Sequence, residues 1–263
     1  MPLPITVVDA FTDKPFAGNP AAVCILPAEK DKGWMQQVAR EMNLAETAFL
    51  LVRADHVALR WFTPTTEVDL CGHATIASAH VLWESGQVAE GQTIRFRTKS
   101  GELTAAKSGA WIELDFPALQ SAPADAPPGL VDALGVRPAA VFKYTFDYLI
   151  ELASEAAVRG LTPDLTAIAR LPARGVVVTA AATTPGFDFV SRFFAPAVGV
   201  PEDPVTGSAH CALAPYWEQK LGKSAFLAYQ ASPRGGIVKV AVRGDRVALG
   251  GQAVTVLRAE LVT

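Results

Sequence analysis

The sequence predicts an α+β fold with two β-rich, pseudo-symmetric lobes, each built around a central helix. Segments with alternating apolar and polar residues occur in both halves of the chain, as in half-buried strands. Each half also has one stretch of small and apolar residues without a polar face, which is typical of a helix buried on all sides. The two halves share a short residue pattern, which indicates an internal repeat.

The strands are predicted from this alternation and from the turn residues between them. Residues 12–20 join the first two strands, and their Pro, Gly and Asn residues supply turn geometry. The predicted strands cover residues 5–9, 21–26, 48–52, 57–62, 93–98 and 111–116 in the first half, and 175–179, 237–242 and 247–250 in the second.

Three helices are predicted. The apolar residues of the segment 34–42 recur at helical spacing, and Asn43 suits the left-handed cap that ends such a helix. The two stretches of small and apolar residues predict buried helices, one over residues 72–83 and one beginning near Gly207.

The repeat consists of an aromatic strand, a Pro-containing loop and a Gly that opens a helix. Residues 60–64 (Arg-Trp-Phe-Thr-Pro) correspond to residues 192–196 (Arg-Phe-Phe-Ala-Pro), and the helix at 72–83 corresponds to 207–217. The distance from Pro to Gly is eight residues in the first half and eleven in the second, so a chance match of two aromatic strands is the alternative. The predicted lobes span residues 1–118, completed by a strand near 253–263, and 129–252, with residues 119–128 as a Pro- and Ala-rich linker.

Composition excludes several classes of protein. With 263 residues, 50% of them hydrophobic, and a net charge of −3, the chain is a globular protein with a sizeable core. The sequence contains no Lys/Arg cluster of the kind that binds nucleic acid, so we expect no nucleic-acid partner. No apolar run approaches the roughly 20 residues of a membrane span, and no secretory signal is visible, so we expect a cytoplasmic protein without membrane contact.

The three cysteines, Cys24, Cys71 and Cys211, form no Cys-x-x-Cys arrangement. This spacing argues against a disulfide framework or a zinc knuckle, and we expect neither a metal nor an organic cofactor.

Four motifs in order along the chain resemble those of the phenazine-biosynthesis PhzF-like isomerases. The resemblance covers nearly the whole chain. It implies the diaminopimelate-epimerase-like fold, in which each lobe is a β-barrel wrapped around its helix and the active site lies between the lobes. The motifs are Asp-Ala-Phe at 9–11 with Phe-Ala-Gly-Asn-Pro-Ala-Ala-Val at 16–23, Asn-Leu-Ala-Glu-Thr-Ala-Phe at 43–49, Phe-Thr-Pro at 62–64 with 67–75, and Glu-Asp-Pro-Val-Thr-Gly-Ser-Ala-His at 202–210.

Glu46 is the predicted acid/base group. It lies between apolar residues just after a predicted helix end, so its carboxylate is expected to meet an apolar wall. Such a wall disfavours the charged form, which suits a group that both removes and returns a proton. A surface or turn glutamate is the alternative. The resemblance implies that Glu46 is the catalytic base.

Gly72, Gly207 and Ser208 are predicted substrate-binding residues because they lie at the starts of the two buried helices. Unpaired backbone N–H groups and the positive end of the helix dipole attract an anion there, such as a substrate carboxylate. The alternative is that both glycines only allow a tight turn.

The resemblance assigns further roles to His73, Asp203 and Asn19. It implies that His73 and Asp203 are catalytic residues that bind substrate and steer the proton, and that Asn19 belongs to a substrate-facing loop. The alternatives are a helix-capping histidine for His73, and turn residues for Asp203, which precedes Pro204, and for Asn19.

Cys71 and Thr206 distinguish the branches of this fold. Related racemases carry a cysteine before each helix start, and these two thiols act on opposite faces of the substrate. Here the first place holds Cys71 and the second holds Thr206, whose hydroxyl is too weak an acid, so a two-thiol racemase is disfavoured. Cys71 is then a candidate substrate contact or a small buried residue beside the site.

The sequence therefore predicts a cofactor-independent isomerase that moves a proton on a small, unsaturated carboxylate. One-base racemisation or epimerisation of an amino or hydroxy acid is the second hypothesis. A non-catalytic carboxylate-binding module is the third. A homodimer is a plausible assembly. Neither the substrate nor any link to a phenazine pathway follows from the sequence.

Overall fold

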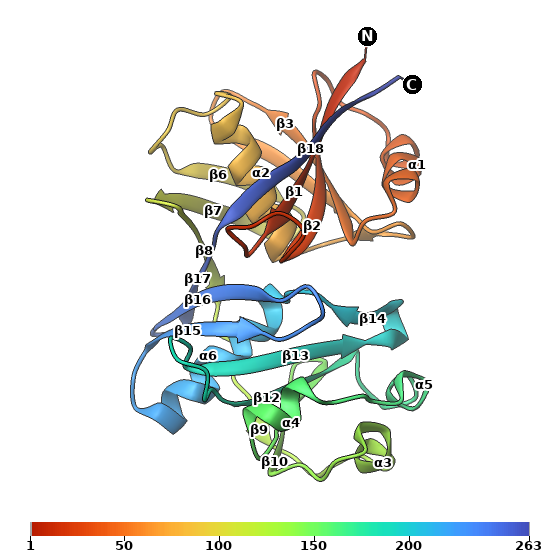
Figure 1. Cartoon of the computed structure of the whole chain (residues 1–263). Coiled ribbons are helices and arrows are strands. Elements are labelled where there is room, and N and C mark those ends of the chain that lie inside the picture. Colours follow the sequence, from red (N-terminus) through yellow and green to blue (C-terminus); the bar gives the residue numbers. More distant parts are fainter. Residues whose placement is uncertain (1, 263) are drawn as a thin grey trace. The chain divides into compact units, whose positions relative to one another are not determined.

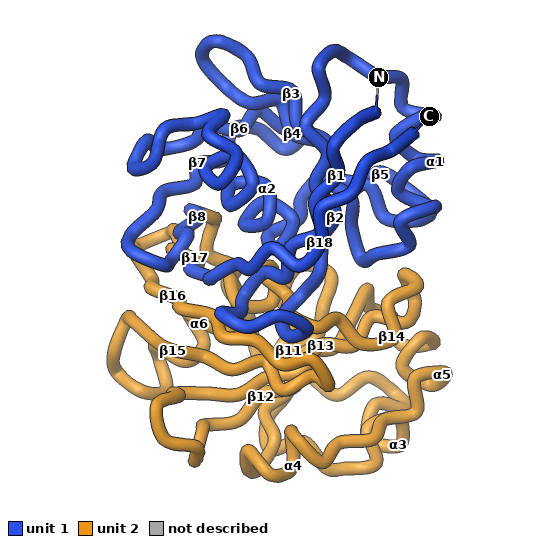
Figure 2. The backbone as a smooth tube through the Cα atoms, turned by 45° about the horizontal axis from the view of Figure 1, so that its top comes forward, with its two compact units in different colours: residues 1–115, 250–263 blue, residues 116–249 orange. Residues whose placement is uncertain are grey.

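The chain folds into two compact units (Figure 2). The computed structural model describes residues 2–262. Unit 1 comprises Met1–Asp115 and Gly250–Thr263, and unit 2 comprises Phe116–Leu249. Residues 119–128, for which we expected a linker, lie within unit 2. Backbone hydrogen bonds hold this segment, including one of 3.0 Å from the Ala124 N–H to the Val141 carbonyl.

Unit 1 is a set of paired strands around the helix α2 (Figure 1). The strand β8 (Trp111–Pro117) begins in unit 1 and ends in unit 2. The other strands of unit 1 are β1 (Leu3–Ala10), β2 (Asn19–Ile25), β3 (Glu46–Val52), β4 (Val57–Phe62), β5 (Glu67–Val68), β6 (Ile94–Thr98), β7 (Gly101–Ser108) and β18 (Ala253–Leu261), and its helices are α1 (Lys32–Met42) and α2 (Gly72–Glu84).

The helix α2 is buried on all sides, as its sequence predicts. It packs against β1, β2, β3, β7 and β18. Every residue from 73 to 79 is buried, and the small side chains of Ala74, Ala77 and Ala79 let the strands approach closely.

The helix α1 covers the outer face of the same strands. Its buried residues Met35 and Val38 pack in one cluster with Phe49 and Phe62 of β3 and β4. The helix ends at Asn43, which has φ 49° and donates its N–H to the Ala39 carbonyl. The predicted left-handed cap is therefore confirmed.

Unit 2 is built in the same way around α6, which packs against β15 and β16. Three short helices contribute to a separate apolar cluster with β11, β12 and β13. No helix within residues 2–262 is both long and apolar enough to cross a bilayer. The elements are β9 (Ala122–Pro123), α3 (Leu130–Leu134), β10 (Ala140–Tyr144), β11 (Asp147–Glu151), α4 (Glu155–Arg159), α5 (Leu165–Ile168), β12 (Gly175–Ala181), β13 (Phe189–Ala195), the 3-10 helix η1 (Pro196–Val198), β14 (Val200–Asp203), α6 (Gly207–Leu221), β15 (Ala225–Gln230), β16 (Gly236–Arg243) and β17 (Arg246–Gly251).

The two units repeat one strand order. In unit 1, β2 and β3 are parallel, β3 and β4 antiparallel, and β4 and β6 parallel. In unit 2, the same sequence of pairings joins β11, β12, β13 and β15.

An ion pair repeats at the same place in both units. Arg60 of β4 donates its Nε–H to Glu67 over 2.7 Å, and Arg192 of β13 donates its Nε–H to Glu202 over 2.7 Å. The internal repeat predicted from residues 60–64 and 192–196 therefore extends to topology and to side-chain contacts.

Candidate active site

Glu46 is the first residue of β3, where it lies in register beside Ala21 of the parallel strand β2. The sequence placed it just after a helix end, and α1 does end at Met42, a few residues earlier. The Glu46 side chain is only 18% exposed, and its Oε2 lies 3.0 Å from Nε2 of His73. The strand register thus brings a carboxylate to the first turn of α2.

His73 contacts three other predicted site residues. Its Nδ1 lies 3.2 Å from the Asn19 Nδ2 and 3.5 Å from the Cys71 Sγ, while its Nε2 faces Glu46. Asn19 is the first residue of β2 and is fully buried. Unit 1 therefore gathers Glu46, Cys71, His73 and Asn19 into one cluster.

The cluster has a defined charge state. Burial by itself lowers the pKa of His73, but the nearby Glu46 carboxylate outweighs it and holds this pKa well above its usual value. Burial and the Glu46 charge raise the pKa of Cys71, so its thiol stays protonated at neutral pH. The negative charge that faces the His73 imidazolium is therefore the Glu46 carboxylate.

The Asn19 amide can serve both protonation states of His73. With its nitrogen toward the ring, as the 3.2 Å contact places it, the amide donates to a neutral Nδ1. Rotated by half a turn, its oxygen would accept from an Nδ1–H. The ring can therefore gain or lose a proton without leaving its position.

Both central helices begin where the repeat predicts. Cys71 is the N-cap of α2 and Thr206 the N-cap of α6, and neither side chain makes a capping hydrogen bond. Gly72 and Gly207 are the first helical residues, so the first-turn N–H groups and the positive dipole end lie at these glycines. Each start can contribute to anion binding.

Asp203 belongs to a second cluster, in unit 2, with Thr206 and Gln230. Thr206 donates its Oγ1–H to Asp203 Oδ2 over 2.6 Å, which explains why it does not cap α6. Gln230 accepts the Thr206 N–H and donates to the Asp203 carbonyl, so it fixes both residues. Ser208 is the second residue of α6.

Arg174 also lies at the start of α6, although no pattern in the sequence pointed to it. This arginine donates to both carboxylate oxygens of Asp147 and, over 3.5 Å, to Ser208 Oγ. The Asp147 side chain is only 1% exposed and is the first residue of the apolar strand β11. A charged residue at the start of an apolar strand could have indicated a buried ion pair. The partner lies 27 residues away and could not be located without the fold.

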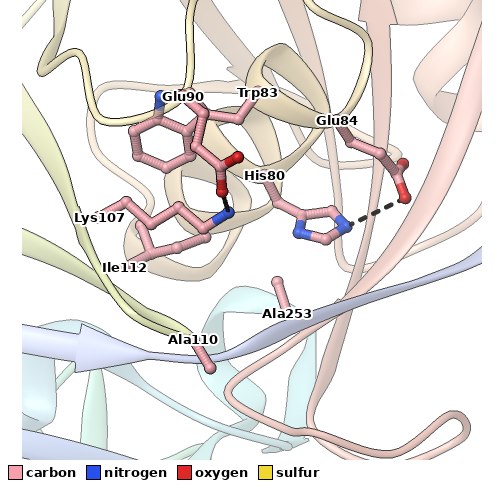
Figure 3. A pocket seen from close by; sticks show the side chains of 8 residues that line it. All are labelled: His80, Trp83, Glu84, Glu90, Lys107, Ala110, Ile112 and Ala253. Carbon is pink, nitrogen blue, oxygen red and sulfur yellow. Dashed lines mark hydrogen bonds and ion pairs between the residues drawn. The ribbon is translucent and has the colours of Figure 1, made fainter.

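A hollow of about 230 Å³ along the C-terminal half of α2 is a weaker candidate (Figure 3). Its carboxylates are already paired, Glu90 with Lys107 and Glu84 with Arg258, each at 2.9 Å. Burial lowers the pKa of its histidine, His80, which is therefore neutral at physiological pH. None of the residues lining it belongs to the cluster around His73.

Gly18 shapes the loop that presents Asn19. Its φ is +64°, and a Cβ at this position would lie 2.1 Å from the Ala10 carbonyl oxygen. Gly86 has a similar φ of +70° with open space around it, so it is a matched control. We expect Gly18→Ala to lower the free energy of unfolding by about 1–3 kcal/mol more than Gly86→Ala, because only the first adds a clash. Urea unfolding measures both, and equal losses would contradict this account of the loop.

Comparison with known proteins places the chain. A family model described as "Phenazine biosynthesis-like protein" matches residues 8–259. An uncharacterized isomerase of Halalkalibacterium halodurans is 58% identical over 263 residues, which is 100% of this chain and 99% of that protein. The chain belongs to the PhzF family. This relative confirms the predicted isomerase class. Its name gives no substrate.

Solved structures confirm the PhzF fold. The crystal structure of a PhzF-family protein of Enterococcus faecalis matches with a TM-score of 0.96 and 41% identity over 100% of both chains. A hydroxyproline epimerase of Agrobacterium vitis matches with a TM-score of 0.67 and 13% identity, over 99% of this chain and 92% of that one. At that identity the likeness shows the fold alone, and it agrees with the expected diaminopimelate-epimerase-like architecture.

Proposed function

We propose that this PhzF-family protein moves a proton on a small, unsaturated, carboxylate-bearing metabolite, with Glu46 as the acid/base group. The observation that carries the proposal is the pair formed by the Glu46 carboxylate and the His73 imidazole, 3.0 Å apart at the start of α2. A carboxylate within hydrogen-bond reach of an imidazole and with little exposure to water has the geometry of a positioned acid/base group.

The proposed step needs only proton transfer. Glu46 takes a proton from carbon, and the electron pair of that C–H bond moves into the conjugated system toward the substrate carboxylate. The developing charge there is stabilised by the His73 imidazolium and by the N–H groups that open α2 at Gly72. The protonated Glu46 then returns its proton to another carbon of the same skeleton, so atoms and charges balance.

Racemisation is the weaker alternative. Cys71 lies 3.5 Å from His73 and is the observation in its favour. The thiol is protonated, however, and the N-cap of α6 is Thr206 instead of a second thiol. The cluster has one competent base, which suits a proton that leaves and returns on one face.

The roles of the unit 2 residues remain predictions. Asp203 is kept as a catalytic candidate that binds substrate and steers the proton, and Gly207 and Ser208 are kept as substrate-binding candidates at the start of α6.

Deuterium incorporation tests the proposal. A panel of unsaturated and saturated carboxylates is first screened for thermal stabilisation of the protein, since a ligand of the native state raises its apparent stability. Compounds that bind are then incubated in heavy water and followed by NMR. We expect deuterium at a carbon other than the one that loses its proton, without inversion of any centre, and no incorporation with Glu46→Gln. Inversion of a pure enantiomer, or full activity of Glu46→Gln, would reject the mechanism.

A further inference from the structure

The three side chains around His73 are also a set of metal ligands. A carboxylate oxygen of Glu46, the Sγ of Cys71 and a ring nitrogen of His73 all lie within 4.8 Å of one another. We propose that these three residues form a binding site for a zinc ion. The inference stands on the positions of these atoms and does not depend on the isomerase function.

The distances fit a zinc ion with small adjustments. Zinc bonds of about 2.0–2.3 Å arranged as a tetrahedron place the ligand atoms about 3.4–3.6 Å apart. In the structure the His73 Nε2 lies 3.0 Å from Glu46 Oε2 and 4.0 Å from Cys71 Sγ. Shifts of about half an ångström bring both separations into range, and the third, between Glu46 and the Cys71 Sγ, is at most 4.8 Å before any adjustment.

The ligand chemistry selects zinc over the abundant hard cations. Thiolate and imidazole are preferred by zinc, whereas magnesium and calcium require mostly oxygen ligands. Zinc binding would release the thiol proton of Cys71 and one ring proton of His73 to solvent, so that thiolate and carboxylate together supply two negative charges to the divalent ion. Cys71 is 7% exposed and His73 5%, so both ligands are already largely shielded from water. Three protein ligands leave a fourth position for water or another small ligand.

Neighbouring groups hold this set in place. The Asn19 side chain contacts Nδ1 of His73, which leaves Nε2 directed at Glu46. With its oxygen turned toward the ring, the Asn19 amide would accept from Nδ1–H, as the partners that orient metal-binding histidines do. Cys71 and His73 are separated by one residue at the first turn of α2, so the buried helix fixes the spacing of two of the three ligands.

Zinc binding and proton transfer exclude each other at this site. A bound zinc ion would use the Glu46 oxygen and the His73 nitrogen that proton transfer requires. Zinc bound at this site would therefore inhibit the proposed proton transfer reversibly.

Cobalt(II) tests the site independently of catalysis. A cobalt ion bound by a thiolate shows a near-ultraviolet charge-transfer absorption, which carboxylate and imidazole ligands do not produce. We expect the metal-free wild-type protein to gain this absorption with one equivalent of cobalt, and zinc to abolish it by displacement. Absence of the absorption from the wild type would overturn the proposal.

Variants identify the ligands. Cys71→Ser should lose the charge-transfer absorption, whereas Cys24→Ser, which alters another buried cysteine of unit 1, should keep it. Competition with a chromophoric chelator should show that zinc affinity is at least about 100-fold lower in Cys71→Ser. Even the loss of a residue that only hydrogen-bonds to a metal ligand lowers metal affinity by about 10–100-fold. Glu46→Gln should weaken zinc in the same assay if the serine variant does not fold. Retention of the absorption in Cys71→Ser, or unchanged zinc affinity in Glu46→Gln, would refute the site.

Discussion

Replacing Glu46 by glutamine is expected to slow deuterium exchange into a substrate by about 10²–10⁴-fold, the usual contribution of a positioned acid/base group. Glutamine keeps the shape of the side chain and a contact to His73, but its amide cannot accept a proton from carbon. Glu41→Gln is the matched control, because Glu41 lies exposed on α1 in the same unit. The exchange rate, followed by NMR at saturating substrate, separates the two variants.

His73→Gln and the double variant show whether the pair acts as a unit. The imidazolium is expected to stabilise both the Glu46 carboxylate and the developing charge on the substrate. Once Glu46 is replaced, replacing His73 as well should therefore slow deuterium exchange little further. The double variant should be about as slow as Glu46→Gln alone. If the two single losses instead multiply in the double variant, the residues contribute separately and the proposed pairing is wrong.

The second large effect concerns acid stability and depends on His210. This histidine of α6 is fully buried, donates its Nδ1–H to the Thr206 carbonyl over 2.8 Å and stacks on Phe189. Burial lowers its pKa from 6.5 to about 4. No group within residues 2–262 forms a hydrogen bond with its Nε2, so a proton there would have no acceptor.

The unfolded chain takes up the His210 proton at a higher pH than the folded chain. Stability from the neutral ring is therefore complete above pH 6.5 and is lost as the pH falls toward 4. Each pKa unit corresponds to about 1.4 kcal/mol, so the wild type should lose about 3 kcal/mol more than His210→Gln between pH 7 and pH 4. Urea unfolding at several pH values measures this difference. Parallel pH profiles for the two proteins would contradict it.

The contributions of other titrating groups to the pH dependence of stability are the same in both proteins, so they cancel in that comparison. Burial would raise the pKa of Glu67, but Arg60 and Lys99 outweigh it and lower the pKa to about 2. The stability that Glu67 contributes is present above its unfolded value of 4.5 and is lost below it. Both proteins share this loss, so their difference reports His210.

The sequence predicts those parts of the fold whose signals are local. A stretch of small residues without a polar face predicts α2, and Asn43 predicts the left-handed end of α1. The aromatic strand at 60–64 and its counterpart at 192–196 reveal the repeat, because each residue of the pattern is read within a few positions. Glu46 and His73 come into consideration through the resemblance of residues 43–49 and 67–75 to the motifs of the PhzF-like isomerases.

The remaining features depend on contacts between distant segments or on weak patterns. The strand β13 is buried along its whole length and shows no alternation, so only its end at residues 192–196 is predicted, through the repeat. The helices α3, α4 and α5 have five, five and four residues, too few to show a period. The approach of Glu46 to His73 follows from the register of β2 and β3, and that of Arg174 to Asp147 from a pairing across 27 residues.

The repeated strand order has a consequence for how this architecture can diversify. The strands of the two units pair in the same order, but the N-caps of their central helices differ. Cys71 places a thiol before α2, and Thr206 places a hydroxyl before α6. A substitution at one N-cap can therefore change the reactive group there while the strands around the helix keep their pairing.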